Sequence, residues 1–244
     1  MNGASRSRVV DAIHRSRLRV YLDATQGNER DALVLYRWHS DLVAALHSVL
    51  GDTEVVLRNA MDRQLQIWND AETGGIGSWL LHEPASPLRS LTAAKRKDAL
   101  RRLHKLPRNP ERDSRSGVSH DDVVAQLTFG VWKDLLPNHL PAAGNSFENT
   151  NRRRIWQEAL IQAFPNAPDD GGEATFWRVN RLHQLRNRVS HLEPLLQVNI
   201  ADAVRDAFGL VRSIDAHVAD WVTGGSHVAP VLARRPEFRK GISR

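Results

Sequence analysis

Residues 179–194 constrain the fold of this chain more than any other stretch. Their apolar side chains recur at steps of three and four residues, which is the spacing of one face of an α-helix. The members of this apolar face are Val179, Leu182, Leu185, Val189 and Leu192. Pro194 cannot continue a helix, and it pushes the residue before it towards an extended conformation. The sequence therefore predicts a helix that buries this face against a core and ends close to His191.

The other side of this predicted helix is polar. His183, Asn187 and His191 are spaced four residues apart and lie one above the next, with Arg186 and Ser190 beside them. A histidine with a pKa near neutral can take a proton from an attacking hydroxyl or give one to a leaving oxygen. An arginine offers a fixed fork of donors to phosphate oxygens. The combination suits chemistry on a phosphodiester, although a solvated basic helix face has the same composition.

Basic residues are concentrated between residues 95 and 115. The formal net charge of the chain is +6, and this segment alone has nine basic against three acidic residues, so its excess equals that of the whole chain. A basic stripe binds a nucleic-acid backbone because each neutralised phosphate releases counterions. The alternative is a charged helix face followed by a solvated loop. From this segment we select Arg101, Arg102 and Lys105 as candidate RNA-binding residues.

A second basic group opens a predicted helix that runs to residue 164. Arg152, Arg153 and Arg154 stand at its start, where positive charge opposes the helix dipole and therefore points to an external anion. Solvent screening makes this electrostatic cost small. We treat the triplet as a further candidate RNA-binding group.

The composition excludes several classes of function. The chain has no cysteine, which rules out disulfides, thiolate catalysis and cysteine-ligated zinc. It has no His-Glu-x-x-His and no aspartate cluster, so no metal site is predicted. Residues 1–25 hold no apolar run of the kind found in secretory signals, and no stretch of 18 apolar residues suggests a membrane span. We expect a cytoplasmic protein with no membrane contact.

Helical patterns dominate the remainder, and no convincing pair of alternating strands occurs. Asn28 is placed to cap a helix that ends before Gly51, and a further helix is predicted from about Thr53 to Asn69. Residues 73–79 have no periodicity and lack the Lys-Ser/Thr of a phosphate-binding loop. The sequence predicts one all-α domain over residues 1–225, followed by a flexible C-terminal tail over residues 226–244.

Five short stretches resemble landmarks of HEPN ribonucleases in the form carried by Abi-like (abortive infection) proteins. The strongest is Leu185–Pro194, in which Arg186 and His191 resemble the family's Arg-x4-His motif. The others occur in the same order and at similar separations as in the family. They are Leu35-Tyr36-x-Trp38, Glu54-x-x-x-Arg58-Asn59, Leu127-Thr128-Phe129-Gly130-x-Trp132 and Ala163-Phe164-Pro165. Many relatives have a second histidine directly after the motif histidine, whereas this chain has Leu192.

The resemblance implies a HEPN-like helical bundle with additional helices and a metal-independent endoribonuclease that uses no cofactor. In these enzymes the ribose 2′-hydroxyl attacks the adjacent phosphate, which leaves a cyclic phosphate and a free 5′-hydroxyl. The resemblance assigns His191 as acid/base, Arg186 to the scissile phosphate and Asn187 to orientation. Arg188 and His183 are supporting candidates for RNA binding.

The resemblance also implies partners and a biological role. The Arg-Asn-x-x-x-His form of the motif occurs once in the chain, so we expect a homodimer with a composite active site that acts on RNA. The implied role is phage defence by abortive infection or action as a toxin, with an antitoxin or inhibitor as a possible further partner. The alternative is a non-catalytic HEPN module that binds RNA or a partner and regulates a neighbouring toxin.

Overall fold

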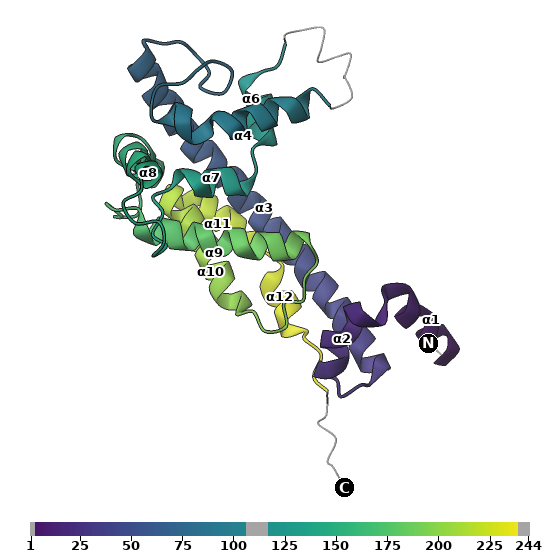
Figure 1. The fold of residues 1–244 in the computed structure, drawn as a ribbon. Helices are drawn as coiled ribbons and strands as arrows, with labels where there is room; N and C mark the ends of the chain where they lie inside the picture. The colour runs from purple at the N-terminus through teal and green to yellow at the C-terminus, as the bar shows by residue number, and fades with distance from the viewer. Residues whose placement is uncertain (1–2, 106–116, 239–244) are drawn as a thin grey trace.

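The computed structural model describes residues 3–105 and 117–238, and Figure 1 shows the arrangement of its helices. Within these ranges the chain forms helices and no strand, so the all-α prediction is confirmed. The first half contains α1 (Gly3–Ile13), α2 (Arg15–Ala24), α3 (Glu29–Thr73), α4 (Leu88–Leu103), α6 (His120–Gln126) and α7 (Phe129–Leu135). The second half contains α8 (Phe147–Glu158), the 3-10 helix η1 (Leu160–Ala163), α9 (Glu173–Ser190), α10 (Ile200–Ile214), α11 (Ala216–Gly224) and α12 (Val228–Ala233).

The long helix α3 is the axis against which most of the other described helices pack. It runs for 45 residues, about 68 Å at 1.5 Å per residue, and α2, α7, α9, α10 and α12 all contact it. The predicted cap is confirmed, because the Asn28 side chain accepts hydrogen bonds from the backbone N–H groups of Arg30 and Asp31 at 3.0 and 3.2 Å. In Figure 1 the helix extends diagonally through the whole molecule.

The predicted helix break at Gly51 is wrong, because α3 continues through this residue. Glycine in a helix interior costs about 1 kcal/mol relative to alanine, which is less than tertiary packing contributes. Leu46, Val49 and Leu50 before it and Leu57 after it are all buried in the core. Packing on both sides therefore overrides the local preference of the glycine.

Helix α9 lies across α3 and carries the predicted apolar face. Val179, Leu182, Leu185 and Val189 are buried, as their spacing predicts. The helix ends at Ser190 with His191 as its C-cap, so the predicted end near His191 is confirmed. Leu192 is the exception to the apolar face. It lies beyond the helix, is 53% exposed, and adopts a left-handed φ of 53°.

The C-terminal segment differs from the predicted flexible tail. Residues 228–233 form α12, which packs on α3 and buries Val228 and Val231. The Trp38 indole N–H on α3 donates to the Val231 carbonyl at 2.8 Å. A six-residue helix with two buried apolar side chains gives little signal in sequence, so this packing does not emerge from periodicity. Residues 239–244 of the predicted tail lie outside the described residues.

The basic segment of residues 95–115 is only partly described. Its first part lies on α4, whereas Arg108, Arg112 and Arg115 fall in residues 106–116, outside the described residues. Ser119 caps α6 through a capping box with Asp122. None of the helices in residues 3–105 and 117–238 combines the length and the apolar character needed to cross a membrane.

Candidate functional site

The candidate site is the polar flank of the last two turns of α9. His183, Arg186 and Asn187 are partly buried there, and Ser190 and His191 are exposed. The Asn187 amide nitrogen lies 3.4 Å from His183 Nε2. The structure therefore brings these predicted residues together on one side of one helix, with the proposed acid/base residue at the solvent-facing end.

Arg186 is held by an acidic residue from α3. Its Nε lies 3.4 Å from Glu54 Oε2, and the side chains are 35% and 17% exposed. Spacing along α3 predicts a charge ladder of Glu54 with Arg58 and Asp62, but the structure pairs Glu54 with Arg186 across two helices. A carboxylate on one side of the guanidinium fixes its position and leaves its remaining N–H donors free for another anion.

His183 is partly buried against α7. Its ring stacks on Phe129 of α7 with centroids 5.9 Å apart and an interplanar angle of 28°. Burial lowers the pKa of His183, and the nearby charges of Lys133, Arg186 and Lys95 lower it further against an opposing contribution from Asp134. A neutral His183 can accept a hydrogen bond from the Asn187 amide, which orients that side chain.

Two lysines beside this flank are not among the RNA-binding residues predicted from the sequence. Lys95 of α4 and Lys133 of α7 both pair with Asp134, at 2.6 and 3.1 Å. Burial would raise the pKa of Asp134, but the two lysines hold it below its usual value. No local pattern marks Lys133, because its proximity to His183 depends on how α7 packs on α9. The two lysines add positive charge to the surroundings of the site.

The turn that follows α9 fixes the position of His191. The His191 backbone N–H donates to the Asn187 carbonyl at 3.0 Å. Leu192 then adopts the left-handed conformation, and the Glu193 N–H returns to the Arg188 carbonyl at 2.8 Å. This bonding pattern is that of a Schellman motif, which satisfies carbonyl groups at a helix end. His191 is thus part of a hydrogen-bonded turn.

Helices α2 and α3 anchor this turn. The Arg17 guanidinium donates to the Leu192 carbonyl, and buried His39 accepts from the Leu195 N–H at 3.2 Å through Nε2. The other ring nitrogen of His39 bonds to the Tyr21 hydroxyl at 2.9 Å. Burial lowers the pKa of His39 and raises the pKa of Tyr21 to about 12, so both groups are neutral at pH 7. We call Arg17, Tyr21 and His39 the turn anchor.

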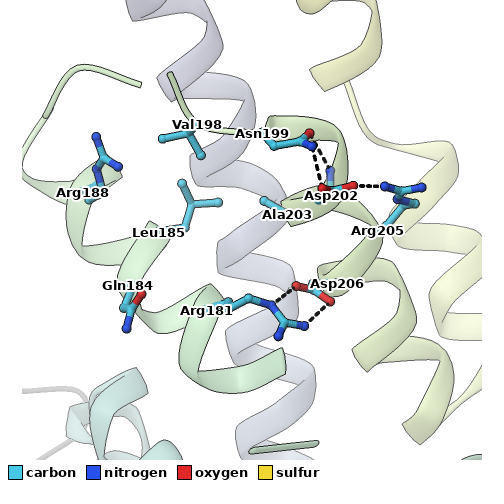
Figure 2. Close-up of a pocket in the computed structure, with 10 residues that line it drawn as sticks. All are labelled: Arg181, Gln184, Leu185, Arg188, Val198, Asn199, Asp202, Ala203, Arg205 and Asp206. Carbon is cyan, nitrogen blue, oxygen red and sulfur yellow. Dashed lines mark hydrogen bonds and ion pairs between the residues drawn. The ribbon is translucent and has the colours of Figure 1, made fainter. Parts of the chain in front are cut away.

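Arg188 lies on a different flank of α9 from Arg186. It lines a hollow of about 560 Å³ between α9 and α10, shown in Figure 2. Its guanidinium donates to the Pro194 carbonyl at 2.6 Å and lies 3.4 Å from Glu193. Arg181 in the same hollow forms a bidentate pair with Asp206 at 2.6 and 2.9 Å (Figure 2). Both arginines have partners within the chain, so this hollow is a poorer candidate for an anion site than the α9 flank.

The RNA-binding candidates on α4 and just after it are exposed, and two of them have partners within the chain. Arg101 and Arg102 are exposed and bond to the side chain and carbonyl of Asp98 at 2.7 and 3.4 Å. Lys105 follows α4 and is exposed.

The arginine triplet of α8 is also engaged locally. Arg152 pairs with Glu148 at 2.5 Å, Arg153 bonds to Asn145 at 2.8 Å, and Arg154 pairs with Glu158 at 2.8 Å. The positive charge of these arginines is therefore paired with acidic and amide side chains of the same region. The sequence pattern predicts an external anion as the partner instead.

Among the described residues, no group of three or more His, Asp or Glu side chains is placed to hold a metal ion. Comparisons with protein-family models, curated proteins and solved structures found no match.

Proposed function

We propose that this protein is a metal-independent endoribonuclease of the HEPN type, whose catalytic residues are Arg186, Asn187 and His191. The observation that carries the proposal is the arrangement on α9: an arginine positioned by Glu54, an amide oriented by His183, and an exposed histidine on one flank. This set can bind a phosphate, orient it and move a proton. A solvated helix face does not require a partly buried carboxylate behind its arginine.

The reaction follows from these groups. The ribose 2′-oxygen bonds to the adjacent phosphorus while the bond from phosphorus to the 5′-oxygen breaks. One proton leaves the 2′-hydroxyl and one is given to the departing 5′-oxygen, and both transfers suit a histidine. Arg186 stabilises the charge that builds on the phosphate oxygens. The products are a 2′,3′-cyclic phosphate and a free 5′-hydroxyl.

A single chain places only one histidine, His191, where it can act on the phosphate, although the reaction has two proton transfers. His183 and His191 are eight residues apart, which corresponds to about 12 Å of helix rise and is too far for one phosphate. We therefore include in the proposal a homodimer in which two His191 and two Arg186 share a cleft. Excess His191→Ala chain mixed with wild type is expected to depress activity below simple dilution once subunits exchange. A fully active monomer by light scattering contradicts the dimer.

Basic residues on α4, together with Lys133, are proposed to add affinity for RNA phosphates. The cellular role that fits the reaction is phage defence or toxicity in the cytoplasm, where an antitoxin or inhibitor would protect the host. The second candidate function is a module that binds RNA without cutting it. Leu192, where many relatives have a second histidine, favours this alternative.

Incubation of end-labelled RNA with the purified protein in EDTA tests the proposal. We expect cleavage that leaves cyclic-phosphate ends, and a loss of about 10²–10⁴-fold in rate in His191→Ala and about 10²–10³-fold in Arg186→Ala. His47→Ala and Arg30→Ala, two exposed positions on α3, are the matched controls and should retain full activity. Binding without cleavage by the wild type supports the module instead. Full activity in either site variant refutes the assignment.

A further inference from the structure

A serine, a histidine and an aspartate meet at a hollow on the side of α3, outside the α9 flank. The Ser78 hydroxyl lies 2.7 Å from His120 Nδ1, and His120 Nε2 lies 3.0 Å from Asp62 Oδ2. The three residues come from the loop after α3, the start of α6 and the middle of α3. The histidine bridges the other two side chains, one through each ring nitrogen.

With a proton on His120 Nε2, the hydrogen bonds of this cluster run in one consistent direction. Asp62 accepts from the Trp79 indole at 2.8 Å and is 17% exposed, so it is a fixed acceptor for a proton on His120 Nε2. A neutral His120 with that proton has a free lone pair on Nδ1, which accepts the Ser78 hydroxyl proton. The backbone N–H groups of Leu80 and Leu81 donate to Ser78 Oγ at 3.2 and 3.1 Å. These donors stabilise negative charge on that oxygen.

The same hollow presents donors that have no partner among the described residues. It has a volume of about 750 Å³ and is lined by Ser78, His120, Arg58, Asn59 and Arg63 among others. No side-chain hydrogen bond or ion pair joins Arg58, Asn59 or Arg63 to another described residue, and Arg58 Nε is fully buried. A buried guanidinium nitrogen without a partner costs free energy, which a bound acceptor would recover.

We propose that Ser78, His120 and Asp62 form a second catalytic site of the serine-hydrolase type, which takes esters whose acyl part carries a negative charge. The assignment is independent of the proposed ribonuclease function. A nucleophile held by a base that is held by a carboxylate is the arrangement by which such enzymes activate a hydroxyl. Here the ring nitrogens exchange roles, since Nδ1 faces the serine.

The reaction balances without a cofactor. Ser78 Oγ bonds to the ester carbonyl carbon and its proton passes to His120 Nδ1. The bond to the leaving alcohol then breaks, and that oxygen takes the proton from His120. Water attacks the acyl-serine with His120 again as base, releases the acid and restores Ser78. Arg58 and Asn59 bind the oxyanion and the charged acyl group at the wall of the hollow.

A fluorophosphonate probe tests whether Ser78 is activated, because it forms an oxygen–phosphorus bond with such serines as fluoride leaves. We expect wild type to be labelled, with Ser78 as the modified residue by mass spectrometry. Labelling should be lost in Ser78→Ala and slowed about 10²-fold or more in His120→Asn and Asp62→Asn. The matched control is Ser40→Ala, since Ser40 is an exposed serine of α3 whose hydroxyl bonds to a backbone carbonyl.

Two further measurements keep the proposal falsifiable. Wild type should hydrolyse 4-nitrophenyl hydrogen succinate faster than 4-nitrophenyl acetate, and Arg58→Gln should remove this preference. Ser78→Ala should keep RNA cleavage, and His191→Ala should keep labelling, so the two functions can fail separately. Absence of labelling in folded wild type, judged by circular dichroism, overturns the proposal and leaves the cluster as a clamp between the loop and α3.

Discussion

The α9 flank and the Ser78–His120–Asp62 cluster each take a carboxylate from α3, but they hold their polar groups differently. On α9 the acting residues come from one helix, and the outermost, His191, is exposed. In the cluster each residue comes from a different segment and is bonded on more than one side. The first arrangement is open to completion by another molecule, whereas the second is complete within one chain.

Two histidines express the same difference through their pKa values. Burial and neighbouring cations lower the pKa of His183, while the hydrogen bond to Asp62 raises the pKa of His120 against the effect of burial. His183 is therefore a neutral orienting group, and His120 gains a proton more readily than an ordinary histidine. The α9 flank thus surrounds its histidine with cations, whereas the cluster places a carboxylate beside its histidine.

The largest effect that separates the regions should follow substitution of Glu54. Glu54→Gln removes the carboxylate that positions Arg186, and a misplaced anion-binding group can cost about 10²-fold in rate. We expect this loss in RNA cleavage with little change in probe labelling of Ser78. Asp62→Asn, eight residues further along α3, is the matched control and should show the reverse. Equal losses of both activities in Glu54→Gln would show a general disturbance of α3.

A smaller effect concerns the pH dependence of stability. The folded pKa of His120 lies above its unfolded value, so its stabilisation is fully present below about pH 6.5 and is lost as pH rises through the folded pKa. The charged groups that face His120 are Asp62 and Asp121, with Arg58 and Arg63 in the same hollow.

His120→Gln removes this dependence, and a hydrogen bond to a charged group is worth about 1.5–3 kcal/mol. Urea unfolding at pH 5.5 and pH 9 should therefore show a larger deficit for His120→Gln at the lower pH. His183→Gln provides the comparison from the α9 flank. Because the pKa of His183 is lowered, its substitution should not produce a deficit that grows at low pH. A constant deficit for His120→Gln contradicts the role of Asp62.

The smallest effect should come from the helix that joins the regions. Gly51 lies in the interior of α3, is exposed, and has no neighbouring atom within 4 Å of the place where an alanine Cβ would stand. Gly51→Ala should raise the free energy of unfolding by about 0.5–1 kcal/mol, measured in urea. RNA cleavage and probe labelling should both stay unchanged. Altered activity in one region alone would mean that bending at Gly51 contributes to that region.

The α9 flank could be predicted from sequence because its information is local. Steps of three and four residues place Arg186, Asn187 and His191 on one helix, and Pro194 marks its end. The partners of these residues could not be predicted from spacing, since Glu54 and Lys133 reach them only through the packing of α3 and α7. The landmark resemblance includes Glu54 but specifies no contact for it.

The cluster at Ser78 could not be predicted from the sequence at all. Sixteen residues separate Asp62 from Ser78 along the chain and forty-two separate Ser78 from His120. Ser78 belongs to a stretch without periodicity, and the pattern around His120 indicates only a capped helix. Such a site depends on tertiary contacts between segments with no shared pattern. The continuity of α3 through Gly51 likewise depends on tertiary packing of its neighbours, which local sequence patterns do not reveal.

The turn anchor connects the amino-terminal helix α2 to the turn that holds His191. Arg17 lies 175 residues before Leu192 in sequence, yet through the Leu192 carbonyl, and through Tyr21 and His39, the anchor holds the turn in which His191 sits. A chain that begins after Asn28 would keep every residue of the Arg-x4-His motif and the hydrogen bond from Leu195 to His39, but it would lose the bonds that Arg17 and Tyr21 contribute to the anchor. Removing those helices would therefore alter the surroundings of the proposed active site.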